Sequence, residues 1–139
     1  MKKFIVILGL LYLFYAINPA LLATETPAAD CAMASVKTEY KNSKAVFVGK
    51  VIGTTEDGDA KTFEFKVEKY WKGIKDRKIK IKVSKTMRFE PFYQAGKSYL
   101  IYAFAGDDGS LRTAKCTRGF QVEFAKEDLK ILGKAKKIR

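Results

Sequence analysis

The sequence predicts a mainly β domain in which five strands form a small closed, or nearly closed, barrel between two short helices. Three observations lead to this prediction. Five segments are rich in β-branched and aromatic residues, short turns separate most of them, and a helical pattern stands at each end of the series. The length of 139 residues suits one domain, and the sequence contains neither an internal repeat nor a sign of a second domain.

The first 23 residues are typical of a secretory signal peptide. Lys2 and Lys3 precede an uncharged run at residues 4–17, and residues 20–23 offer a small residue for cleavage. This run is shorter than the roughly 20 residues that a membrane span needs. We therefore expect an exported protein, secreted or periplasmic once residues 1–23 are removed, with an uncleaved N-terminal anchor as the alternative. Residues 24–30 are expected to form a flexible lead-in.

A helix and a buried strand are expected next. Residues 32–43 form a one-sided helical pattern, with apolar or aromatic side chains at Met33, Val36 and Tyr40. Residues 45–51 read AVFVGKV, as in a buried strand, and Gly49 indicates a bulge or a bend. A turn is expected over residues 54–60, which read TTEDGDA.

The other strands alternate strictly or are continuously apolar. Residues 61–71 and 78–85 alternate apolar with charged side chains, which is typical of strands with one buried face. Residues 98–104 predict another buried strand, and residues 111–116 are expected to pair back on it as a hairpin. This order of strands, with few long loops, favours a barrel.

The chain is expected to finish with a short helix and a basic tail. Residues 125–132 place Leu129 and Leu132 on the inward side of a helix, and Gly133 ends it. Residues 134–139 are strongly basic and are expected to fray.

Composition excludes several kinds of catalytic and metal site. The chain has no His, so it can build neither a Ser-His-Asp or Cys-His nucleophile nor an imidazole zinc site. Its two Cys are too few for a four-ligand structural zinc site. We therefore expect no enzyme activity, no catalytic residue, no metal site and no cofactor. The formal net charge of +12 favours association with polyanions.

The two cysteines predict one disulfide. In the oxidising environment that export implies, an even number of cysteines favours pairing, and Cys31 with Cys116 is the one intramolecular pair available. Such a bridge would tie the start of the mature chain to a point near its end. Two free thiols remain the alternative.

Several pieces of sequence, taken in order, carry a family resemblance. They are Cys31 with the helix that follows, then residues 45–51, 70–73, 95–100, 115–118 and 128–133. Together they resemble the netrin-like (NTR) domain of the tissue inhibitors of metalloproteinases (TIMPs) and their bacterial relatives, over residues 31–133. The resemblance implies a five-stranded OB-fold-like barrel with flanking N- and C-terminal helices. It also implies a monomeric binding module whose partner is a protease or another exported protein.

The resemblance further implies where such a partner would bind. The binding edge would consist of Cys31, Ala32 and Met33 together with the neighbouring segment of Met87 and Arg88. By the same resemblance, this edge would be held near Cys116 by the disulfide.

One departure from the family pattern bears on mechanism. The inhibitors begin with Cys-x-Cys, and the first Cys supplies the amine and carbonyl that chelate the protease zinc. Here Ala29 stands where that first Cys is expected, whereas Cys31 and Cys116 match the second bridge. Zinc chelation is therefore not expected, and any protease inhibition would have to be steric.

A second hypothesis is that a lysine-rich strand face binds polyanions. The face would consist of Lys78, Lys80, Lys82 and Lys85, with Trp71 nearby as a stacking group. Export makes acidic glycans, cell-wall polymers or lipid head groups more natural ligands than intracellular nucleic acid. Two plainer interpretations stay open: the lysines form a solvated exterior that Glu64 and Glu68 partly neutralise, and Trp71 is a structural anchor.

Overall fold

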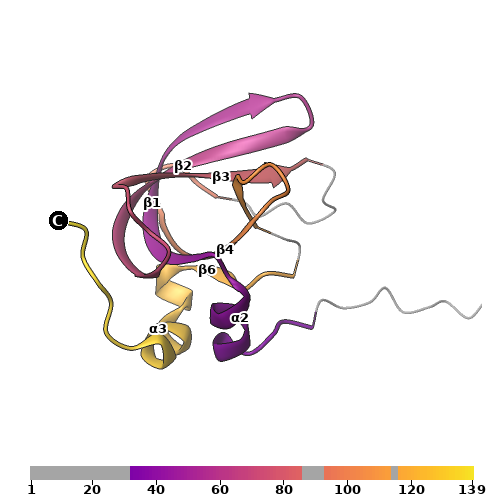
Figure 1. The fold of residues 1–139 in the computed structure, drawn as a ribbon. Helices are drawn as coiled ribbons and strands as arrows, with labels where there is room; N and C mark the ends of the chain where they lie inside the picture. Colours follow the sequence, from indigo (N-terminus) through magenta and orange to yellow (C-terminus); the bar gives the residue numbers. More distant parts are fainter. Residues whose placement is uncertain (1–31, 86–92, 114–115) are drawn as a thin grey trace, which may run out of the picture. The chain divides into compact units, whose positions relative to one another are not determined.

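The computed structural model describes residues 32–85, 93–113 and 116–139. The expected leader and lead-in lie outside these residues, as do Cys31, Met87 and Arg88 of the expected binding edge. In chain order the elements are α2 (Val36–Asn42), β1 (Ala45–Asp57), β2 (Ala60–Lys72), β3 (Lys78–Ser84), β4 (Ser98–Ala105), β5 (Leu111–Arg112), β6 (Gly119–Gln121), the 3-10 helix η1 (Val122–Phe124) and α3 (Lys126–Leu132) (Figure 1).

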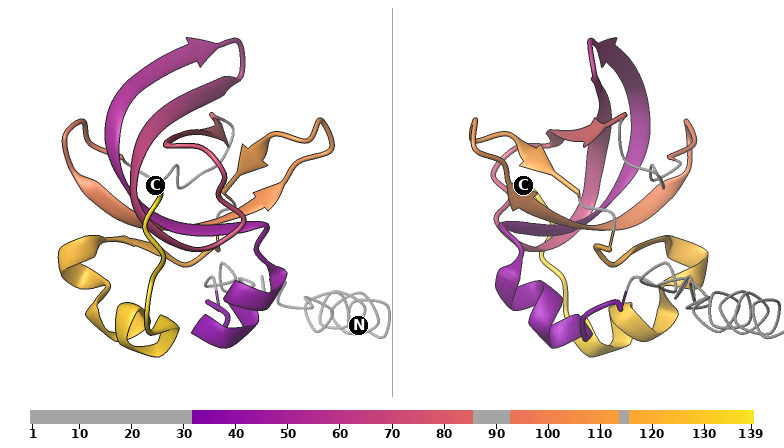
Figure 2. Two further views of the ribbon diagram at one scale, coloured as in Figure 1. Left: turned by 60° about the vertical axis from the view of Figure 1, so that its left-hand side comes forward. Right: turned by 90° about the vertical axis from the view of Figure 1, so that its right-hand side faces the viewer.

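Five strands close into a ring of backbone hydrogen bonds (Figure 2). β1 pairs with β2 along one edge and with β4 along the other, β2 pairs with β3, and β5 joins β3 to β4. These pairings are antiparallel except for the short β3–β5 contact, and β6 also pairs with β4. The expected mainly β class with two short helices is confirmed. The finer assignment to an OB fold remains a proposal.

Three elements differ from the sequence-based expectation. β1 continues through the residues expected to form a turn, because its hairpin with β2 stays paired as far as Asp57 and Ala60. Of the strand expected at residues 111–116, the described residues form β5 only, and residues 114–115 lie outside them. β6 was not expected, because three residues are too few to show alternation. α2 begins later than expected, where the Ser35 side chain accepts a hydrogen bond from the Thr38 amide at 3.2 Å.

Gly49 lies at a bulge, as the sequence predicted. The register between β1 and β2 shifts between Val48 and Gly49, and again at two other places along the pair. A Cβ at Gly49 would lie 3.0 Å from side-chain atoms of both Phe47 and Phe65, so a larger residue here would require one of the two aromatic side chains to shift. Bulges bend and twist a strand, which helps a ring of five strands to close.

Two apolar clusters lie on opposite faces of β1 and β4. The inner cluster fills the ring and includes Phe47 and Phe65, whose rings meet edge to face with centroids 5.9 Å apart. The outer cluster lies between the ring and the two helices, and it includes Val48, Tyr102 and Trp71. The helices therefore cover one outer face of the ring, which is visible at the bottom of Figure 1.

The C-terminal tail does not fray, contrary to expectation. The Trp71 indole N–H donates to the Gly133 carbonyl at 3.0 Å, which holds the chain directly after α3. Tyr70 and Lys136 then exchange both of their backbone hydrogen bonds, at 2.9 and 2.7 Å. Ile138 packs against the inner cluster. Apolar burial and backbone pairing thus order a segment that its charge alone would leave in solvent.

Gly73, which follows β2, provides a test of this geometry. Its φ is +67°, and a Cβ there would lie 2.0 Å from the Lys44 carbonyl oxygen. Gly73→Ala should therefore combine a left-handed backbone cost of about 1 kcal/mol with a packing clash of about 1–3 kcal/mol. Gly58→Ala is the matched control, because Gly58 also has a positive φ, +53°, but has open space around it. Urea unfolding should give a clearly larger loss for Gly73→Ala, and equal losses would contradict the close approach.

Candidate functional site

The segment that precedes α2 is held in place by Arg118. The guanidinium group donates from Nη1 to the Ala34 carbonyl at 3.1 Å. It also forms a two-pronged ion pair with Asp128 of α3, at 2.9 Å from Nε and 2.6 Å from Nη2. The Tyr102 hydroxyl on β4 donates to the same carboxylate at 3.1 Å. One network of hydrogen bonds therefore joins four parts of the chain: the segment before α2, β4, the residue that precedes β6, and α3.

The charges of this network are stabilised by one another. Asp128 is only 3% exposed, so its carboxylate depends on the cation and the hydroxyl that bond to it. The hydrogen bonds to Asp128 raise the pKa of Arg118, which keeps the guanidinium charged. Burial, and then the neighbouring Asp128 charge, raise the pKa of Tyr102, which keeps the phenol neutral. Arg118 thus stays charged and Tyr102 stays neutral near neutral pH, so both keep donating hydrogen bonds to Asp128.

The expected partner-binding edge is only partly described. Ala32 and Met33 are exposed, Met33 by 51%, and they directly precede the carbonyl that Arg118 binds. Cys116 is exposed at the turn two residues before Arg118, and the described residues include no free thiol. Because Cys31 lies outside them, the Cys31–Cys116 bridge stays a prediction. The same holds for the approach of the Met87–Arg88 segment to this edge.

Of the four lysines expected to share one face, Lys78, Lys80 and Lys82 alternate along β3 and Lys85 follows the end of the strand. Three of the four amines lie near an acid: Lys78 at 4.0 Å from Glu64, Lys82 at 3.3 Å from Asp108, and Lys85 at 2.9 Å from Glu56. Lys80 lies opposite Glu64 in the β2–β3 register. These pairs are solvent-exposed and therefore weak, but a polyanion would have to compete with each of them.

Trp71 does not belong to a binding face, contrary to the hypothesis that it stacks on a ligand. Its side chain is 9% exposed and packs in the outer cluster beneath the helices. The amine of Lys69 lies 5.8 Å from the ring centroid. Strict alternation would put Trp71 on the same face as Phe65 and Val67. The register shifts in the β1–β2 pairing place it instead in the outer cluster, together with Leu129 and Leu132 of α3.

Two further lysines, Lys50 and Lys66, form a row beside the lysine face through strand register. Lys50 on β1 lies opposite Lys66 on β2, and Lys66 lies opposite Lys78 on β3. Within the described residues neither Lys50 nor Lys66 forms an ion pair. Three directly opposed lysines repel one another across the sheet. Alternation in the sequence indicates that Lys66 and Lys78 point outward, but only the register shows that Lys50 forms a row with them.

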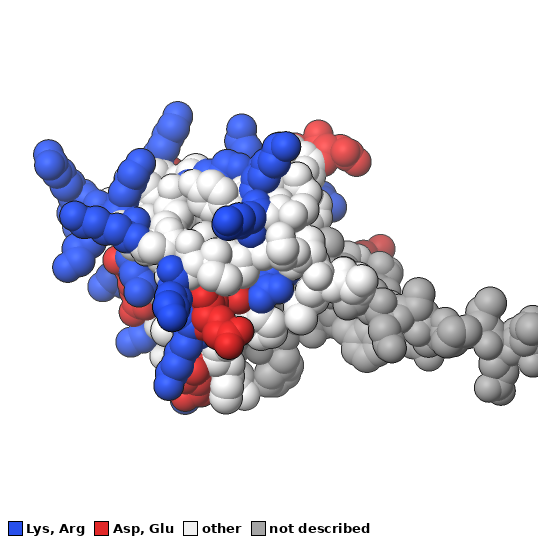
Figure 3. Space-filling model, turned by 90° about the horizontal axis from the view of Figure 1, so that it is seen from below, with Lys and Arg blue, Asp and Glu red and all other residues white. Residues whose placement is uncertain are grey.

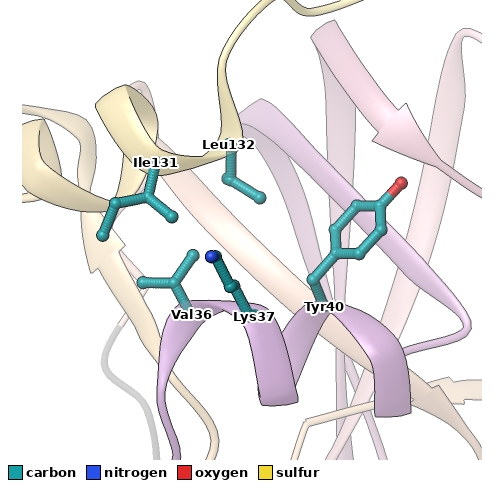
Figure 4. A pocket seen from close by; sticks show the side chains of 5 residues that line it. All are labelled: Val36, Lys37, Tyr40, Ile131 and Leu132. Atoms are coloured by element: carbon teal, nitrogen blue, oxygen red, sulfur yellow. The ribbon is translucent and has the colours of Figure 1, made fainter.

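An open groove separates the two helices (Figure 4). It has a volume of about 330 Å³, and its lining side chains come from α2 and α3: Val36, Lys37, Tyr40, Ile131 and Leu132. Ile131 at its rim is 55% exposed. The lining is apolar apart from Lys37 and the Tyr40 hydroxyl, which donates to the Trp71 carbonyl at 3.4 Å. The groove could therefore accept an apolar side chain, but its five lining residues supply no carboxylate or thiol.

No protein-family model and no curated protein matches the chain. Within residues 32–85, 93–113 and 116–139, no helix has the length and apolar character needed to cross a bilayer. Those residues also contain no group of three or more potential His, Cys, Asp or Glu metal ligands.

The Arg118–Asp128 pair should contribute far more to stability than an exposed pair. Asp128→Asn would leave the partly buried guanidinium without a counter-charge, and we expect a loss of about 3 kcal/mol in the free energy of unfolding. Glu56→Gln, which removes the acid of the exposed pair with Lys85, is the control and should leave the urea midpoint nearly unchanged. Similar urea midpoints for the two variants would show that the Arg118–Asp128 pair contributes no more to stability than an exposed pair.

Proposed function

We propose that the chain is an exported, non-enzymatic module that binds a protein partner through the edge before α2. The observation that carries this proposal is the bond from Arg118 to the Ala34 carbonyl, which holds the edge while Met33 remains 51% exposed. An apolar side chain on a fixed backbone loses little conformational entropy when a partner covers it. Such a side chain is a suitable anchor for a protein interface.

The fold supports an OB-type assignment of this module. Three features favour this assignment: the closed ring of five strands, the bulged first strand, and the two helices packed against one outer face. Together with the resemblance to the tissue inhibitors of metalloproteinases, this arrangement makes a protease the first partner to test. Because Ala29 replaces the chelating Cys of that family, we propose steric obstruction of the protease rather than capture of its zinc.

The compartment is part of the proposal. The leader-like residues 1–23 and the single possible disulfide both suit a secreted or periplasmic protein. We propose that the mature module acts as a monomer there.

Truncating Met33 should weaken partner binding without unfolding the domain. For Met33→Ala we expect at least a tenfold rise in the inhibition constant against a metalloprotease that the wild type inhibits, since burial of this side chain contributes about 1.5–3 kcal/mol. Ile52→Ala is the matched control, because Ile52 is also an exposed apolar residue, 43% exposed, but lies on β1. Inhibition assays against a panel of metalloproteases would decide this. Failure of the wild type to inhibit any of them, or equal effects of the two variants, would refute the proposed edge.

Polyanion binding is a second candidate function. It is favoured by Lys50 and Lys66, which are aligned beside Lys78 and form no ion pair within the described residues, and by the high positive net charge. The ligands proposed are acidic glycans, cell-wall polymers or lipid head groups outside the cell. This candidate does not depend on the edge before α2.

Salt dependence tests the second candidate. Affinity of the wild type for polyphosphate or dextran sulfate should fall steeply between about 50 and 200 mM NaCl, because each lysine or arginine contact releases a condensed counterion. Fluorescence anisotropy with a labelled polymer would measure this. Affinity that does not change over that range would exclude an electrostatic site.

A further inference from the structure

A basic surface outside the lysine face is formed by two segments that are far apart in the sequence. We call it the tail–turn surface. It consists of the exposed side chains of the β2–β3 connection and the C-terminal segment, namely Lys75, Arg77, Lys134, Lys136, Lys137 and Arg139. Figure 3 views the face that carries the helices, and it shows Lys and Arg side chains gathered on the side where the C-terminal segment runs in Figure 1.

The fold brings these two segments together. β3 pairs with β2 only as far as Lys66, and beyond that point the Val67 amide donates to the Arg77 carbonyl. The C-terminal segment takes the next position along β2, where Lys136 bridges Tyr70. Both segments also reach the inner cluster, because Ile74 belongs to it and Ile138 packs against it. Charged side chains beside these anchors are therefore carried on ordered backbone.

The tail–turn surface has little compensating negative charge. Asp76 lies between Lys75 and Arg77, and Glu68 precedes them on β2. Within the described residues, no ion pair includes any of the six basic side chains. The lysine face differs, since carboxylates lie within 4.0 Å of three of its four amines. Repulsion among the six cations is thus relieved mainly by solvent and salt.

We propose that the tail–turn surface is the site of polyanion binding, and that its ligand is a linear polymer bearing phosphate or sulfate groups. This inference rests on the second candidate function. A ligand with several linked anionic groups relieves the repulsion at several positions at once, and the ordered segment has already lost the conformational entropy that a frayed tail would lose on binding. Arg77 and Arg139 add planar guanidinium groups, whose paired N–H donors match tetrahedral oxyanions.

The surface suits a soluble polymer better than a membrane. Peripheral attachment to a bilayer gains strength from apolar side chains that enter the interface. Here the apolar residues of the two segments point the other way, since Ile74 is 6% exposed and Ile138 packs against the inner cluster. The side chains that point outward are the charged lysines and arginines, which can contact successive anionic groups of a polymer.

Two variants of equal charge locate the site. The first, K75Q/R77Q/K137Q/R139Q, removes four charges from the tail–turn surface. The second, K78Q/K80Q/K82Q/K85Q, removes four charges from the lysine face and serves as the control. Thermal melting first establishes that both variants fold. We expect the first to fold because its replaced side chains are exposed and form no ion pair within the described residues. Binding to labelled polyphosphate and to labelled dextran sulfate is then measured as a function of NaCl.

We expect the tail–turn variant to bind at least tenfold more weakly than the wild type. The slope of log affinity against log salt should fall by about 3, at roughly 0.7 for each of the four cations removed. The lysine-face variant should bind less than threefold more weakly. An equal or larger effect in the lysine-face variant would overturn the inference while leaving polyanion binding intact. No binding of either polymer by the wild type would overturn both.

The choice of probe tests the class of ligand. Polyphosphate and dextran sulfate distinguish phosphate from sulfate as the source of the oxyanion, and tighter binding to either supports the proposal. Binding to polyglutamate of matched length should be clearly weaker, and equal affinity would overturn the preference for tetrahedral oxyanions. Tighter binding to vesicles that contain about 30 mol% phosphatidylserine than to either polymer would show that the surface serves a membrane instead.

Discussion

Over Val46–Gly49, β1 is buried on both faces and hydrogen-bonded along both edges, and both the closure of the ring and the packing of the helices follow from this. Its inner side chains, such as Phe47, fill the ring, while Val46 and Val48 on the other face support the two helices. A strand in that position must curve to meet β2 and β4 at once, which the bulge at Gly49 permits. The helices, in turn, have a place to pack only because β1 and β4 offer them an apolar outer face.

Two side chains fasten the ends of the domain to this ring by binding backbone carbonyls. Arg118 holds Ala34 at the N-terminal end, and Trp71 holds Gly133 at the C-terminal end. Each fastener is itself immobilised, Arg118 by its ion pair with Asp128 and Trp71 by burial. Both proposed binding surfaces lie next to these points. Ordered backbone therefore presents the exposed Met33 at one end and the basic tail–turn side chains at the other, and in each case less entropy is lost on binding.

The parts of the fold that follow from local pattern were predicted well. Alternation identified β2 and β3, continuous apolar character identified β4, and Gly133 marked the end of α3. Local pattern failed for β6 and for the extension of β1, because three residues carry too little periodicity and a polar hairpin arm resembles a turn. It also failed for the tail, since the Tyr70–Lys136 bridge joins residues that no local signal connects.

The amino-acid sequence alone was enough to predict the mainly β class, the absence of imidazole chemistry, the excess of positive charge and the outward direction of the lysines on β2 and β3. Each of these depends on composition or on the two-residue period of a strand. Both can be recognised without knowing which distant residues meet in the folded chain. Three features became apparent from the folded chain alone: Trp71 is covered, Arg118 pairs with Asp128, and the tail pairs with the end of β2 at Tyr70. Those outcomes depend on register, ring closure and the packing of α3, which bring together residues that are distant in the sequence.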